Sequence, residues 1–109
     1  MTDKEQEERQ GRILNRVRIA YERVLGVYED TTNKKQKRYI KAELAAMKKS
    51  RDIILNAFDA SGDGRYAIVA KIDDEMAKLA LDYEDIDSKG AINGYAMALA
   101  LYHDNEQPL

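Results

Sequence analysis

Apolar residues return every three or four positions along most of this 109-residue chain. That period gathers apolar side chains on one face of an α-helix, whereas a half-buried β-strand would alternate apolar and polar residues. Four stretches keep the helical period, and none alternates like a strand. The sequence therefore predicts an all-α protein with helices over about residues 4–28, 32–58, 65–83 and 91–103.

Turn and capping residues separate the four stretches. Residues 29–33 include Asp, Thr and Asn, whose side chains accept hydrogen bonds from the first turn of a helix. Two glycines interrupt residues 59–64, and an acidic break over residues 84–90 offers Asp87 or Ser88 as a cap for the last helix. Short connections favour antiparallel neighbours. We expect a small antiparallel helical bundle of four helices that forms a single domain over residues 1–109.

The residue content argues against catalysis. The chain has no cysteine, so thiolate metal sites and cysteine nucleophiles are impossible. Its one histidine, His103, stands at the end of the last predicted helix, where histidine more often acts as a helix-end cation than as a general base. No phosphate-binding glycine loop and no serine nucleophile motif occurs. We expect a protein that is not an enzyme and uses no cofactor.

The chain also lacks recognisable targeting features. Its N-terminus is acidic and polar where a secretory signal would be basic and then apolar. No apolar run approaches the roughly 20 residues that span a bilayer. We expect an intracellular, cytoplasmic protein that makes no membrane contact.

Positive and negative charges are divided along the chain. Residues 11–51 hold twelve Lys and Arg against four Asp and Glu, whereas residues 52–109 hold four against twelve. The formal net charge of −2 is therefore a cancellation. Such a chain can pair its own halves, meet a second copy head to tail, or offer a charged face to a partner.

The positive charge follows the outer faces of the first two predicted helices. Stripes of Lys and Arg can neutralise phosphates, so nucleic-acid binding is the second functional hypothesis. It ranks below protein binding because the net charge is negative and no recognition motif is evident. The residues that would carry it are Arg12, Arg16, Arg23, Lys34, Lys37, Arg38, Lys41 and Lys48.

Arg51 departs from this pattern. On a helical projection it falls near Ile40 and Phe58, inside the apolar stripe of residues 32–58. A guanidinium in such a place needs a carboxylate partner. We expect a buried or half-buried ion pair between Arg51 and an acid of residues 65–83 or of the segment that follows them.

The loop at residues 59–64 resembles the opening of an EF-hand calcium loop. Oxygen-bearing side chains stand at loop positions 1, 3 and 5, glycine stands at position 6, and Phe58 directly precedes the loop. The candidate metal ligands are Asp59, Ser61 and Asp63. Position 12, where that family places a bidentate Glu, is Ala70. Calcium regulation is therefore the third hypothesis, behind a turn in which these residues cap the next helix.

The last predicted helix has almost no polar face. Between residues 91 and 102 the one strongly polar side chain is Asn93. A helix that is apolar on all sides is usually buried, so this one lies either at the centre of the bundle or against a second subunit or partner. Tyrosine and methionine are favoured at interfaces. The residues expected at such a contact are Tyr95, Met97, Leu101 and Tyr102.

These patterns favour a non-enzymatic α-helical protein-protein interaction protein of adaptor, structural or inhibitor type. A homo-oligomer formed through the apolar last helix remains open. The expected partner is thus another protein or a second copy, with nucleic acid as the alternative.

Overall fold

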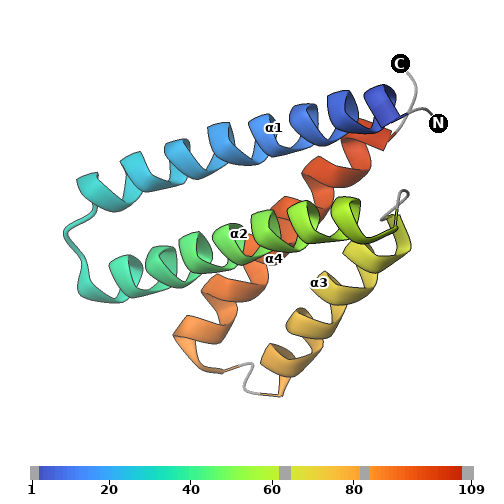
Figure 1. Ribbon diagram of the computed structural model, residues 1–109. Coiled ribbons are helices and arrows are strands. Elements are labelled where there is room, and N and C mark those ends of the chain that lie inside the picture. Colours follow the sequence, from blue (N-terminus) through green and yellow to red (C-terminus); the bar gives the residue numbers. More distant parts are fainter. Residues whose placement is uncertain (1–2, 62–64, 82–83, 107–109) are drawn as a thin grey trace.

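Four helices make up the computed structural model, which describes residues 3–61, 65–81 and 84–106 (Figure 1). They are α1 (Asp3–Asp30), α2 (Lys34–Ser61), α3 (Arg65–Ala80) and α4 (Ile86–Glu106). Within these described ranges there is no strand. The predicted all-α class and the four-helix bundle are confirmed.

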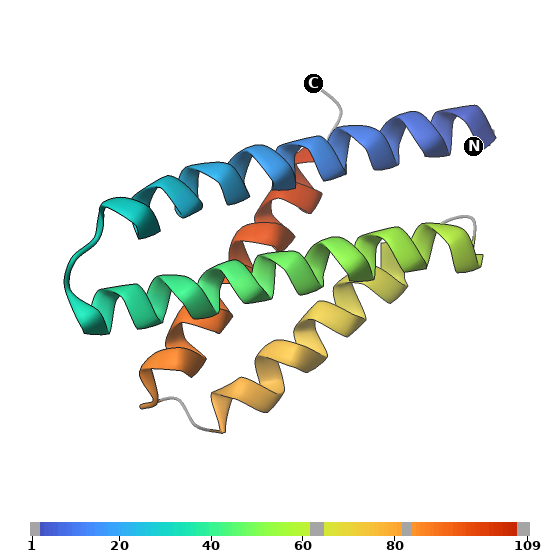
Figure 2. The same cartoon turned by 60° about the vertical axis from the view of Figure 1, so that its left-hand side comes forward.

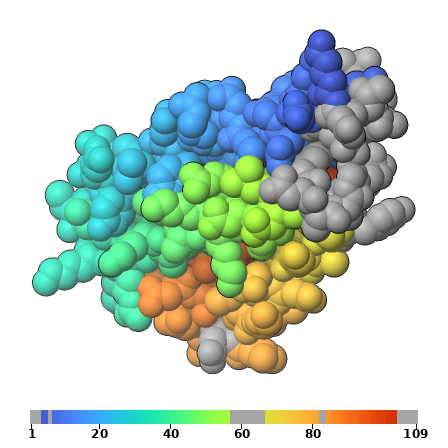
Figure 3. Space-filling view, viewed as in Figure 1, coloured from blue at the N-terminus to red at the C-terminus, as the bar shows by residue number. Residues whose placement is uncertain are grey.

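The helices form two layers. α1 and α2 run antiparallel, side by side, and α4 crosses them diagonally on one side, with α3 beside it (Figures 1 and 2). Both α2 and α4 pack against all three other helices, whereas α1 and α3 do not pack against each other. The opposite side of the α1–α2 layer faces the viewer in the space-filling view (Figure 3). No helix in the described part of the chain is long and apolar enough to cross a membrane.

The hydrophobic core draws on every helix. Its buried members are Ile13 and Val17 of α1, Ala46 and Ile54 of α2, Ile68 and Ile72 of α3, and Tyr95 and Tyr102 of α4. The apolar stripes seen in the sequence therefore meet in one cluster. Burial raises the pKa of the Tyr95 phenol above its ordinary value, because a low-dielectric environment disfavours the phenolate.

The joint between α2 and α4 is unusually close. A Cβ atom placed on Gly90 or Gly94 would overlap the backbone carbonyls of Tyr39 or Glu43 on α2. Only glycine permits two helix backbones to approach this far. Between them the Asn93 amide donates a hydrogen bond to the buried carboxylate of Glu43. α4 packs against all three other helices, as one of the two predicted alternatives expected, while Ala96 and Ala100 stay exposed.

The first interhelical connection follows the sequence prediction. The side-chain oxygen of Asn33 accepts hydrogen bonds from the backbone N–H groups of Lys35 and Gln36, at 2.9 and 3.1 Å. Asn33 therefore caps α2, as expected from the composition of residues 29–33.

The predicted break over residues 84–90 is wrong in most of its length. α4 begins at Ile86, and Asp85 directly precedes it, accepting a backbone hydrogen bond from Lys89 (3.1 Å) and a side-chain hydrogen bond from Ser88 (3.4 Å). Neither Asp87 nor Ser88 is the cap, because both lie inside the helix. Acidic residues are favoured in the first turn of a helix, where they face the positive end of its dipole. The same acids that looked like a break are thus suited to a helix start.

Candidate functional site

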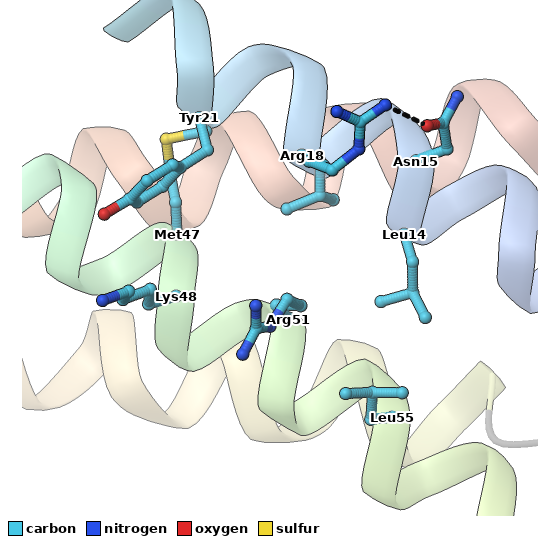
Figure 4. A pocket seen from close by; sticks show the side chains of 9 residues that line it. Leu14, Asn15, Arg18, Tyr21, Met47, Lys48, Arg51 and Leu55 are labelled. Atoms are coloured by element: carbon cyan, nitrogen blue, oxygen red, sulfur yellow. Dashed lines mark hydrogen bonds between the residues drawn. The ribbon is translucent and has the colours of Figure 1, made fainter. Parts of the chain in front are cut away.

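A groove of about 410 Å³ lies between α1 and α2. Apolar side chains form much of its surface, and Leu14 points from α1 toward α2, where Leu55 stands (Figure 4). The lining residues are Leu14, Asn15, Val17, Arg18, Tyr21, Met47, Lys48, Arg51 and Leu55. Its volume falls in the range of ligand and peptide sites in proteins.

Cations stand on both walls of this groove. Arg18 projects from α1, whereas Lys48 and Arg51 project from α2 (Figure 4). The Lys48 ammonium lies 6.0 Å from the centroid of the Tyr21 ring on the opposite wall. No carboxylate is among the described residues that line the groove. The site therefore combines an apolar floor with a cationic rim.

Within the described residues, the guanidinium groups of Arg18 and Arg51 pair only with neighbours on their own helices. Arg18 contacts Glu22 at 3.0 Å and Asn15 at 2.8 Å, and Arg51 contacts Asp52 at 3.5 Å. The Arg18 and Arg51 side chains remain 59% and 52% exposed. Exposed pairs of this kind contribute at most about 1 kcal/mol. An incoming carboxylate can therefore replace these local partners at little cost.

The predicted buried ion pair of Arg51 is wrong. Its described partner is the neighbouring Asp52, and its side chain faces the groove rather than α3. The physical reason is that α2 buries the side carrying Ala46, Ser50 and Ile54. The side toward α1 stays partly open, so a residue on the projected apolar stripe can still reach solvent there.

A different arginine is buried. Arg9 on α1 is 6% exposed, its Nη2 donates a hydrogen bond to the Tyr102 hydroxyl at 3.3 Å, and its guanidinium carbon lies 5.8 Å from the Tyr102 ring centroid. This residue was not singled out from the sequence. The available signal was that Arg9, Ile13 and Val17 are spaced by four and share one helical face.

The other side of α2 joins the basic and acidic parts of the chain. Arg38 pairs with Asp87 of α4 through two contacts of 2.9 Å, and Lys49 pairs with Glu75 of α3 at 2.9 Å. The hydrogen bond from Lys49 lowers the pKa of Glu75, and the same bond raises the pKa of Lys49. Asp87 likewise raises the pKa of Arg38. Some basic residues of the first half of the chain are thus neutralised by acidic residues of the second half.

The residues of the nucleic-acid hypothesis fall into separate places. Arg23 lines a hollow between α1 and α4, whereas Lys48 lines the α1–α2 groove and Arg38 is paired with α4. The Lys37 ammonium lies over the Tyr28 ring at 4.8 Å. The remaining members, Arg12, Arg16, Lys34 and Lys41, are exposed. The structure does not gather the eight cations on one surface.

Two of the four expected interface residues are core residues instead. Tyr95 and Tyr102 are 5% and 0% exposed, so placing them at an interface was wrong; the crossing of α4 against the other three helices covers them. Met97 and Leu101 are partly exposed and line the hollow of about 330 Å³ between α1 and α4. The hollow thus contains the other two residues that were expected at an interface.

The candidate metal residues fall largely outside what the structure describes. Asp63 lies outside the described residues, and so do the side chains of Asp59 and Ser61, although α2 continues through Ser61. Within the described side chains, no group of three His, Asp or Glu is placed to hold a metal ion.

Fold and groove together define a class: a small all-helical bundle with an apolar, cation-rimmed groove between two antiparallel helices. No protein-family model, curated protein or solved structure matches this chain.

Proposed function

We propose that this protein is a non-enzymatic interaction protein, of adaptor, structural or inhibitor type, that docks another protein in the groove between α1 and α2. The groove itself is the observation that carries the proposal. It is apolar enough to gain from losing water and has polar groups at its rim, the arrangement typical of protein interfaces. Arginine and tyrosine, two residue types enriched at binding hot spots, are both present in it.

The groove supports protein binding better than nucleic-acid binding. A phosphate backbone would engage the cations but leave Leu14, Met47 and Leu55 without an apolar partner. Tyr39, which follows Lys37 and Arg38 in the sequence of α2, is half-buried, and burial raises the pKa of its phenol. It is therefore a poor platform for stacking a base.

Site-specific photocrosslinking in cells tests the proposal. A benzophenone amino acid at position 55 stands in the groove, and the matched control at position 71 stands on α3, outside it. We expect a discrete heavier protein adduct from position 55 that position 71 does not give. Adducts that nuclease removes, or equal labelling from both positions, would contradict protein docking at this site.

Self-association is tested separately by light scattering of the purified protein. A dimer held by opposite charges dissociates as salt is raised, whereas one held by the apolar Met97–Leu101 hollow persists. If the protein is a monomer at both low and high salt, self-association is excluded and the partner is a different protein.

A further inference from the structure

The groove has the length of two helical turns. Leu14 and Tyr21 mark its extent on α1, and Met47 and Leu55 mark it on α2. At a rise of 1.5 Å per residue these spans are about 10 and 12 Å. A docking helix that presents apolar residues at i, i+3 or i+4, and i+7 covers the same distance, and helices bind in grooves through this set of anchors.

The distribution of charge determines what the flanks of such a helix must carry. An apolar face laid on Leu14, Met47 and Leu55 leaves its two flanks beside the two walls. One flank then meets Arg18 and the other meets Lys48 and Arg51. Like charges at an interface are strongly disfavoured, whereas carboxylates on both flanks would complement both walls.

A second copy of this chain is a poor occupant. Its helix α3 carries as many basic as acidic residues and keeps Ile68 and Ile72 fully buried in its own core. Its acids Glu75 and Asp87 are already paired with α2. Presenting an acidic helix with an apolar face would therefore require the second copy to unfold in part. A separate protein meets the requirement without that cost.

We propose that the α1–α2 groove binds an acidic amphipathic helix of another protein, with three apolar anchors on the floor and carboxylates paired to Arg18 on one wall and to Lys48 and Arg51 on the other. This inference rests on the proposed docking function and specifies its partner chemistry.

The test uses a stapled helical peptide of about 18 residues, because shorter isolated helices are marginally stable in water. It carries Leu at i, i+4 and i+7 and Glu along both flanks. Two matched peptides change one feature each: Lys replaces every Glu, or Ser replaces every Leu. Binding to the full-length protein is measured by fluorescence anisotropy at low and moderate salt.

We expect the acidic peptide to bind at least about tenfold more tightly than either matched peptide, since each tenfold step corresponds to about 1.4 kcal/mol. Arg51→Glu should lower the affinity for the acidic peptide by about tenfold, and Lys48→Glu should lower it by a similar factor. Lys71→Glu makes the same change of net charge on exposed α3 and should leave affinity within about twofold. Thermal melting of each variant verifies that the fold is retained, which is expected because all three side chains are exposed.

Several outcomes would overturn the inference. If the lysine peptide binds as well as the acidic one, or if Arg51→Glu and Lys71→Glu have equal effects, the partner is not selected by the cationic rim. If the position-55 crosslink to a protein is nevertheless observed, docking stands and only its chemistry is wrong. If no peptide binds while decanoate or a DNA duplex does so in an Arg51-dependent manner, both the helix partner and protein docking fail.

Discussion

The two sides of α2 meet their neighbours in opposite ways. Toward α4, the backbones approach so closely that Gly90 and Gly94 have no room for a Cβ, and the Asn93 amide donates a hydrogen bond to the Glu43 carboxylate between the helices. Toward α1, the contact leaves a groove of about 410 Å³ rimmed by cations whose described carboxylate partners are local. Close packing without voids is what stabilises a core. The α4 side therefore holds the fold together, while the α1 side has surface available for a partner.

Charge follows the same division. On the side of α3 and α4, Arg38 and Lys49 are paired with acids more than twenty residues away along the chain. On the α1 side, Arg18 and Arg51 pair with residues one to four positions away. The long-range pairs link separate helices, whereas the short-range pairs lie within one helix. The cations near α1 are consequently the ones that can change partner without loosening the bundle.

The largest effect is expected at Gly94. Gly94→Ala should destabilise the protein by about 3 kcal/mol, because the new methyl group would meet the Glu43 carbonyl and the Ala46 side chain. Urea unfolding followed by circular dichroism measures the loss. Gly94 would otherwise be a position where alanine improves a helix, so the predicted sign is opposite to that of helix propensity.

Gly11 is the matched control. It lies within α1, and a Cβ placed there meets no atom within 4 Å. Gly11→Ala should stabilise the protein by about 0.5–1 kcal/mol. If both substitutions stabilise, the close approach of α2 and α4 is wrong and the contrast between the two sides of α2 disappears.

The next effect concerns the polar pair in the same joint. Asn93→Ala removes the amide donor from the buried Glu43 carboxylate and should cost about 2 kcal/mol. Glu43→Gln should cost less, because a glutamine oxygen can still accept the hydrogen bond from Asn93. The unfolding midpoints of the two variants measure these losses of stability. If Asn93→Ala loses no more stability than Glu43→Gln, the hydrogen bond between Asn93 and Glu43 does not stabilise the contact between α2 and α4.

The four helices could be predicted from the sequence, but the way in which they cross one another could not. Local periodicity and the Asn33 cap are properties of neighbouring residues, so four helices could be predicted. The small residues Gly94 and Ala98 were visible in the sequence, but which helix they approach depends on how α4 crosses the bundle. The groove was missed because its walls come from two helices. Its one visible signal was Arg51 on an apolar stripe, which sequence reasoning explained by a buried partner instead of an open surface.

A smaller effect is expected from the ion pair between α2 and α3. Lys49 lowers the pKa of Glu75 below its ordinary value of 4.5. The unfolded chain therefore binds the proton more readily, and the stabilisation is complete above about pH 4.5 and is lost as pH falls through the lowered pKa. Because the Lys49 side chain is 54% exposed, we expect less than about 1 kcal/mol.

Urea unfolding between about pH 6 and 3 tests this sign. The free energy of unfolding should fall more steeply in the wild type than in Glu75→Gln. Lys49→Met should flatten the profile in the same direction but less, because Lys78 still pairs with Glu75 at 3.4 Å. Parallel profiles in all three proteins would show that the long-range pair does no more for stability than a local one.

The smallest effect on stability is expected at Arg51, and it separates stability from binding. Arg51→Ala and Lys41→Ala should each change the free energy of unfolding by no more than about 0.5 kcal/mol, because both side chains are exposed.

Arg51→Leu should raise the thermal midpoint, since it adds apolar surface beside Leu14 and Leu55. Arg51→Leu should also weaken binding of the acidic peptide, because one wall of the groove loses a positive charge. A site kept for binding can hold a residue that the fold alone would not select. A clear loss of stability in both Arg51 variants would instead make Arg51 part of the core and the groove a packing defect.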